Sequence, residues 1–155
     1  MAEPTAADVE AVRASIGREP VAAFEVVVRD RGGAPAVIRN APFTADGRPM
    51  PTRYWLVDRE LTREVARLEA AGGVKAAEAA VDPEALAATH RAYEAEREAA
   101  VPAGWDGPRP FGGVGGTRQG VKCLHAHYAY WLAVGADPIG EWVDARLRAG
   151  AASRS

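Results

Sequence analysis

The chain has 155 residues, a net charge of -2 at pH 7 and a single cysteine. This length predicts one domain, residues 1–155, with an ordered core over 5–148 and a frayed tail over 149–155. One cysteine excludes an intramolecular disulfide, and the charge argues against sequence-independent nucleic-acid binding. The N-terminus has no basic segment followed by an apolar one, and no uncharged run is long enough to span a membrane. We therefore expect a cytoplasmic protein with neither nucleic-acid nor membrane partners.

The first part of the chain predicts a helix followed by a small sheet. Thr5 and Asp8 have the spacing of a capping box, which begins a helix that ends near Ile16. Residues rich in β-branched and aromatic side chains then predict strands. These strands cover residues 22–29, 36–39 and 52–57. A glycine turn joins the first two as a hairpin, and a proline-rich, turn-rich loop over residues 41–52 precedes the third.

The remainder of the chain predicts helices around one long loop. Helices are expected over residues 59–71, 75–80, 84–100, 120–134 and 138–148. Asp58 and Asp82 are placed to cap two of them, and Pro83 favours a helix start. In the helix over residues 84–100, the solvated face is marked by the charged residues Arg91, Glu94, Arg97 and Glu98. The predicted fold class is α+β: a small antiparallel sheet of about three strands packed by several helices.

Residues 101–120 are rich in proline and contain seven glycines, which excludes a regular element. A loop of this length in a compact domain is usually functional or disordered. The loop leads into the segment Lys122 to His127, which holds one of the two lysines, the only cysteine and two of the three histidines. This clustering of rare residues marks the one candidate site in the sequence.

A glycine-rich loop that enters a helix is a potential anion site, because free backbone N–H groups and the positive end of the helix dipole face outward. The glycines would let the backbone approach a ligand, and the basic side chains would add charge. The candidate ligand-binding residues are Gly113, Gly115, Gly116, Arg118, Lys122 and His125. The segment matches neither the Walker motif nor the dinucleotide-binding motif, so only a general anion site is predicted.

Cys123 and His127 are the candidate catalytic residues. Residues four apart share a helix face, so helical spacing pairs this thiol with this imidazole and sets His125 apart. The pair predicts a nucleophile with its base, or half of a zinc site whose other ligands would have to come from His90 or from carboxylates, and no metal site is assigned. The competing interpretations are a buried, unreactive cysteine, a loop that only connects two elements, and a His90 that flanks the core.

Three segments resemble, in the same order, a bacterial family catalogued as domain of unknown function number 501. They read APFTADGRPMPTRYWL at residues 41–56, GGVGGTRQGVKCLHAHY at residues 112–128 and DPIG at residues 137–140. The resemblance implies a cytoplasmic protein common in actinobacteria, encoded near enolase, a septum-formation protein and an exopolyphosphatase-like phosphatase. It implies no established activity. Many members carry cysteines at the positions of Asp30, Gly32 and Asp58, so no cysteine-rich metal site of that kind is expected here.

The leading hypothesis is a protein that binds a small anionic, phosphate-bearing ligand at residues 112–127. Thiol-based hydrolase or transferase chemistry through Cys123 and His127 is compatible with it, and the sequence assigns neither an enzyme class nor a cofactor. One alternative is a non-catalytic protein-interaction module linked to cell division or phosphate metabolism, with Trp105 in its surface. The other is a metal-binding protein that uses Cys123 and His127. The sequence leaves the oligomeric state open.

Overall fold

Three antiparallel strands form one sheet in the order β1-β2-β3. Their bounds are β1 (Ala22–Arg29), β2 (Pro35–Thr44) and β3 (Tyr54–Leu56). The computed structural model describes residues 2–154. β3 is shorter than the sequence predicts. β2 is longer, because Pro42 continues the strand instead of ending it. The pairing with β1 is irregular at this point, between Ala22 and Phe24, and a bulge is one of the few places where a sheet accepts proline.

Six helices and one short 3-10 turn complete the described chain. Their bounds are α1 (Ala6–Ile16), α2 (Arg59–Ala70), α3 (Gly73–Ala80), α4 (Pro83–Ala99), η1 (Val114–Gly116), α5 (Leu124–Val134) and α6 (Pro138–Arg154). The predicted caps are confirmed: Thr5 and Asp8 form the capping box of α1, and Asp58 and Asp82 accept backbone N–H groups of α2 and α4. The fold class is α+β, as expected. The predicted tail is helical as far as Arg154, and Ser155 lies outside the described residues.

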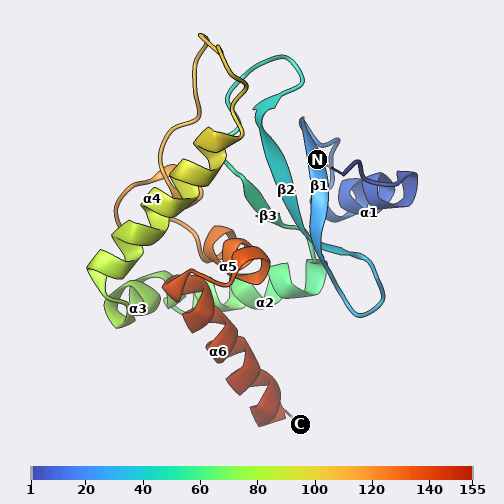
Figure 1. Cartoon of the computed structure of the whole chain (residues 1–155). Coiled ribbons are helices and arrows are strands. Elements are labelled where there is room, and N and C mark those ends of the chain that lie inside the picture. The colour runs from blue at the N-terminus through green and yellow to red at the C-terminus, as the bar shows by residue number, and fades with distance from the viewer. Residues whose placement is uncertain (1, 155) are drawn as a thin grey trace.

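The sheet has α1 on one side and α5 on the other (Figure 1). Each face carries its own group of buried apolar side chains. The smaller group lies under α1 and consists of Val12, Phe24, Ile38 and Val57. The larger group lies on the opposite face, where α5 packs on β3 and α6 packs on α5. Alternate residues of β2 point to opposite faces, so Val37 belongs to the larger group and Ile38 to the smaller. α5 is therefore the central helix, between the sheet and α6.

α5 begins at Leu124, later than the Gly120 start that the sequence predicts. Gly120 has a φ of +67°, which glycine adopts readily, and Cys123 is extended, with φ -153° and ψ 129°. Two carboxylates from other helices hold this segment. Glu78 accepts the N–H of Val121 at 3.0 Å, and Glu69 accepts the N–H of Leu124 at 2.8 Å. Cys123 is consequently the N-cap of α5 and lies outside its regular spiral.

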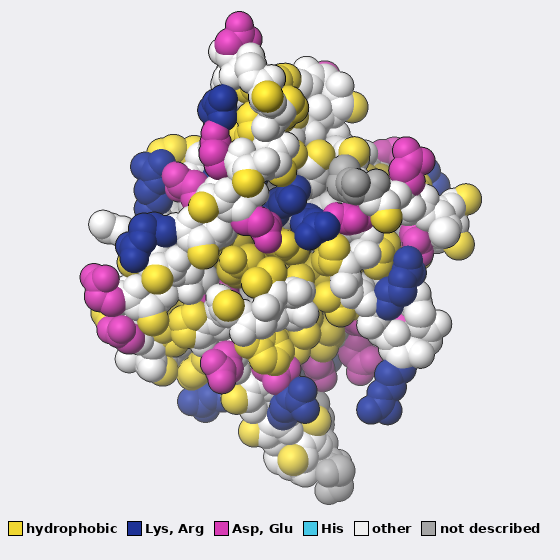
Figure 2. Space-filling view, in the orientation of Figure 1, with side chains coloured by type: hydrophobic (Ala, Val, Ile, Leu, Met, Phe, Trp, Pro, Cys, Tyr) yellow, Lys and Arg dark blue, Asp and Glu magenta, His cyan; other side chains and the backbone are white. Residues whose placement is uncertain are grey.

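Across residues 2–154, no helix combines the length and the apolar character needed to cross a bilayer. Figure 2 shows basic and acidic side chains mixed over one face of the molecule, with hydrophobic side chains gathered in its middle. This face carries no extended field of a single sign.

Candidate functional site

We call residues 112–120 the glycine-rich loop. His90 on α4 bonds to this loop at two points, near its start and at its end. The side chain is 2% exposed, and its Nδ1 accepts the N–H of Val114 at 3.0 Å. Its Nε2 donates to the carbonyl of Gly120 at 2.8 Å. These two bonds require a neutral ring with the proton on Nε2. Burial lowers the pKa of His90, which favours this same neutral form.

Arg97 holds the start of the same loop from inside the protein. It is 2% exposed and donates to the carbonyls of Gly112 at 2.6 Å and Pro51 at 2.9 Å. Its guanidinium also lies over the ring of Tyr93. The expectation that Arg97 belongs to the solvated face of α4 is therefore wrong, because the buried loop carbonyls need a donor and this side chain supplies it.

Gly113, one of the expected ligand residues, is required for packing. A Cβ at this position would lie 2.6 Å from Cβ and Nδ1 of His90, closer than atoms can approach. Gly116 has a φ of +82° and donates its N–H to the carbonyl of Gly113 at 3.0 Å. Both glycines shape the turn, and neither lines the pockets on the two sides of the loop.

Arg118 lies on the α4 side of the loop, where its charge is balanced. Its guanidinium pairs with Glu94 at 3.2 Å and covers the exposed ring of Phe111. The pocket on this side has a volume of about 570 Å³ and is lined by Arg91 and Arg118 together with two carboxylates, Glu94 and Glu98. The wall of this pocket therefore carries charges of both signs.

A second pocket lies on the β3 side of the loop and has a volume of about 440 Å³. We call it the basic pocket. It is lined by Arg18, Val21, Met50, Thr52, Tyr54, Trp55, Leu56, Gly115, Lys122, Cys123, His125 and Ala126. Arg18 and Lys122 contribute positive charge to this wall and no carboxylate does, counting only residues 2–154. The structure thus brings Lys122, Gly115 and His125 together and places Arg118 on the other side.

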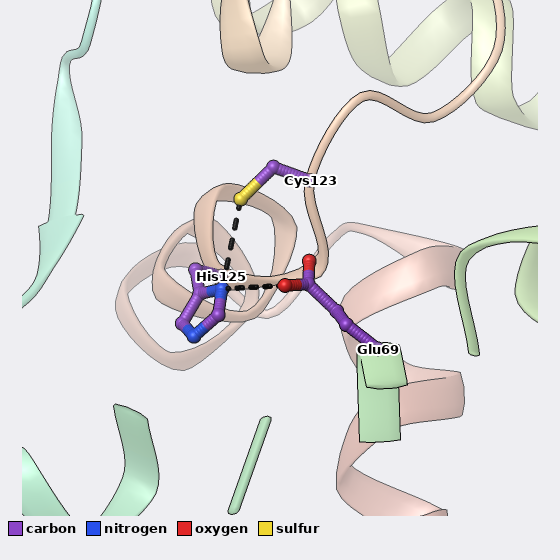
Figure 3. A group of neighbouring side chains, drawn as sticks. All are labelled: Glu69, Cys123 and His125. Atoms are coloured by element: carbon purple, nitrogen blue, oxygen red, sulfur yellow. Dashed lines mark hydrogen bonds and ion pairs between the residues drawn. The ribbon is translucent and has the colours of Figure 1, made fainter. Parts of the chain in front are cut away.

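Cys123 pairs with His125 and not with His127. The Sγ of Cys123 lies 3.7 Å from Nδ1 of His125 (Figure 3). The predicted pairing with His127 assumed that Cys123 is helical, and the extended backbone at the N-cap removes the four-residue relation. A third side chain, Glu69 from α2, brings Oε1 to 3.3 Å from the same His125 nitrogen. All three side chains are half-buried.

His127 is enclosed in the core between α5 and α6. Its Nδ1 donates to Asp137 at 2.7 Å, and both side chains are buried. The other oxygen of Asp137 accepts the N–H groups of Ile139 and Gly140 at the start of α6. The imidazole therefore ties α5 to the cap of α6 and lines neither pocket. The catalytic pair predicted from the sequence is not formed in this structure.

The second ring nitrogen of His125 is also engaged, because Nε2 donates to the carbonyl of Thr62 at 3.0 Å. Its bonds to Cys123 and to Thr62 outweigh burial and raise the pKa of His125 to about 9. Together, the side chains of Glu69, Cys123 and His125 can support two kinds of chemistry. The imidazole can take the proton of the Cys123 thiol, or the sulfur, nitrogen and carboxylate can bind a metal ion together.

Glu69 and Arg18 are the members of this region that sequence reasoning missed. Glu69 is a charged residue near the end of an amphipathic helix, a position typical of solvated side chains. Arg18 follows the glycine that ends α1. Neither is near Cys123 in the sequence, and no local pattern points to either.

Asp30 and Asp58 both accept hydrogen bonds from nearby backbone N–H groups. Asp30 accepts the N–H groups of Gly32 and Ala34 in the turn between β1 and β2. Asp58 accepts the N–H of Leu61 as the cap of α2. These carboxylates therefore have structural partners in this chain.

Comparison with known proteins supports the resemblance seen in the sequence. No curated protein and no solved structure matches the chain. A family model described as "Protein of unknown function (DUF501)" matches residues 26–145, which is more than half of the chain. The matched region contains the glycine-rich loop, Glu69, Cys123 and His125. The chain therefore belongs to the DUF501 family of proteins of unknown function.

Proposed function

We propose that the protein binds a small anionic, phosphate-bearing ligand in the basic pocket. One observation carries the proposal: Arg18 and Lys122 line this pocket, and neither forms an ion pair with any carboxylate of residues 2–154. A concave surface that concentrates one sign of charge attracts ions of the opposite sign, and its walls strengthen that attraction. The ligand would supply the missing negative charge.

The neighbouring surface extends the same lining. A further pocket of about 550 Å³ shares Arg18 and Trp55 with the basic pocket and adds Arg59 and Arg63. No carboxylate of the described chain lines it either. The guanidinium of Arg18 lies over the Trp55 ring at 5.4 Å, which positions the charge between the two hollows. This arrangement suits a ligand with more than one negative group.

The binding energy is expected to come from side chains and not from the start of α5. The N–H of Leu124, at the first position of that helix, already donates to Glu69. A phosphate there would meet a carboxylate. The proposal therefore keeps Lys122 and Gly115 from the sequence hypothesis, replaces Arg118 by Arg18, and sets aside the helix dipole as the main attraction.

A thermal-shift screen tests the proposal, with inorganic phosphate, pyrophosphate, phosphosugars and nucleotides as probes. We expect at least one probe to raise the melting temperature of the wild type. For that probe, Lys122→Ala lowers the affinity roughly 10-fold, because a charge-assisted hydrogen bond contributes about 1.5–3 kcal/mol and 1.4 kcal/mol corresponds to tenfold.

The chain provides a matched control, since Lys75 is the only other lysine and lies exposed on α3. Lys75→Ala and Arg118→Ala should bind the probe as tightly as the wild type does. The proposal is wrong if no probe stabilises the wild type, or if Lys75→Ala weakens binding as much as Lys122→Ala.

The interaction-module alternative depended on Trp105, and this ring is engaged within the chain. It stacks on Phe43 with the ring centroids 4.1 Å apart, and its N–H donates to the carbonyl of Pro108. We therefore favour ligand binding. A cytoplasmic location, expected from the single cysteine, stays a prediction.

A further inference from the structure

The side chains of Glu69, Cys123 and His125 converge on one point beside the basic pocket. Nδ1 of His125 lies 3.7 Å from the Cys123 sulfur and 3.3 Å from a Glu69 oxygen. All three candidate ligand atoms lie within 4.8 Å of one another. Metal bonds of about 2.0–2.3 Å in a tetrahedron place neighbouring ligand atoms roughly 3.3–3.8 Å apart. The two measured distances fall in this range.

Hydrogen bonding alone does not account for this convergence. In a thiol–imidazole–carboxylate triad, the carboxylate orients the imidazole through the nitrogen that faces away from the thiol. Here Glu69 and Cys123 approach the same nitrogen, Nδ1, while the far nitrogen donates to Thr62. One proton on Nδ1 can only be shared between the two acceptors, in a three-centre bond at the long distances seen here, whereas a metal ion binds all three groups directly.

The atoms that would not bind the ion are already fixed by the backbone. Nε2 of His125 donates to the carbonyl of Thr62, which leaves the Nδ1 lone pair for a ligand when the ring is neutral. The second oxygen of Glu69 accepts the N–H of Leu124 at 2.8 Å. Such outer contacts are typical of histidine and carboxylate ligands in metal sites, because they set the orientation of each ligand.

We propose that Glu69, Cys123 and His125 form a zinc site with one position left open toward the basic pocket. A thiolate and a carboxylate balance the two charges of the ion, and sulfur with imidazole favours zinc over magnesium or calcium. Cys123 and His125 both line the pocket, so water or an anion can take the fourth position. The site needs neither Arg18 nor Lys122 and stands apart from the proposal of anion binding.

The test uses the full chain without a polyhistidine tag, stripped of metal and titrated with Co²⁺ and then Zn²⁺. We expect one equivalent of Co²⁺ to give tetrahedral ligand-field bands and a thiolate charge-transfer band, which Zn²⁺ displaces. Cys123→Ser should abolish the charge-transfer band. Glu69→Gln and His125→Gln should weaken affinity at least 10–100-fold, the range seen even for outer-shell partners.

Glu78→Gln is the matched control, because Glu78 also accepts a loop N–H but lies outside the cluster. It should bind cobalt like the wild type. The inference fails if the wild type shows no thiolate band, or if Glu78→Gln and Glu69→Gln weaken binding equally.

A measurement on the unaltered chain keeps the test decisive if a variant does not fold. X-ray absorption at the zinc edge should report one sulfur ligand, with nitrogen and oxygen ligands completing the shell. Equimolar Zn²⁺ should also slow alkylation of Cys123, the only thiol. A zinc shell without sulfur, or an alkylation rate unaffected by zinc, would overturn the site. Either outcome leaves the anion screen to be judged by its own result.

Discussion

The two sides of the glycine-rich loop use similar residue types in opposite ways. On the α4 side, His90 and Arg97 are buried and their polar atoms bond to loop backbone, while Arg118 is paired with Glu94. On the β3 side, Lys122 faces a pocket that no carboxylate of residues 2–154 lines, and the nearby Cys123 is half-buried. The residues on the α4 side maintain the shape of the loop. On the β3 side, positive charges and possible metal-ligand atoms face a pocket.

This difference shows why residue type alone is a poor guide to function in this chain. A histidine or arginine near a glycine-rich loop has ligand chemistry, but a buried loop also needs partners for its own N–H and carbonyl groups. His90 and Arg97 meet that need. The functional candidates are the polar groups left over once the loop is satisfied.

The largest expected effect comes from removing the donor on the α4 side. Arg97→Met leaves the carbonyls of Gly112 and Pro51 without their buried partner, and each such loss costs about 1–3 kcal/mol. Urea unfolding should therefore show a loss of about 3 kcal/mol. Arg91→Met, exposed on the same helix, should change stability by less than about 0.5 kcal/mol. Equal effects of the two changes would show that the guanidinium does not hold the loop.

His90, on the same side of the loop, makes the free energy of unfolding depend on pH. Its lowered pKa keeps the folded ring neutral, whereas the unfolded chain takes up a proton below about pH 6.5. The stability that it contributes is complete above that pH and declines as the pH falls, by at most about 1.4 kcal/mol per pH unit. His127, whose ring centre lies 5.6 Å away, and Asp137 also act on its charge.

His90→Gln separates this effect from the loop contacts, because an amide can accept from Val114 and donate to Gly120 without titrating. Free energies of unfolding measured between about pH 5 and 7 should depend less on pH in this variant than in the wild type. An unchanged slope would mean that His90 does not cause the acid sensitivity.

The smallest effect tests whether charge balance distinguishes the two pockets. Glu94→Gln removes the partner of Arg118 and should alter stability by less than about 1 kcal/mol, as expected for an exposed ion pair. It should also create weak binding of pyrophosphate at the α4 side, which the wild type lacks. Isothermal titration calorimetry of the variant and of Glu94→Gln combined with Arg118→Ala measures this gain. If Glu94→Gln does not bind more pyrophosphate than the wild type, Glu94 is not what prevents anions from binding in that pocket.

Local sequence rules account for much of the fold. Thr5, Asp58 and Asp82 start helices where their side chains can accept backbone N–H groups, and these caps act within three residues. The β-branched run at residues 22–29 forms the predicted strand. The predicted loop at Pro42 is wrong, because the place of this proline in a strand depends on an irregularity in the pairing of β2 with β1.

The candidate site was only partly accessible from sequence. The segment around Lys122 and Cys123 was found from its rare residues, and it does line a pocket. The pairing of Cys123 was wrong because Glu69 and Glu78, distant in the sequence, hold the segment extended and delay α5. Such tertiary contacts leave no periodic signal in the sequence. The carboxylate of Glu69, which joins Cys123 and His125, could therefore be identified only from the structure.

A pyrophosphate titration followed by amide NMR can show on which side of the loop anions bind. Isotope-labelled wild-type protein should show saturable shifts at Gly115, Lys122 and Cys123, with little change at Arg118 or Arg91. Anions do not bind on the β3 side if the largest saturable shifts appear at Arg118 and Arg91, or if no amide shifts at all.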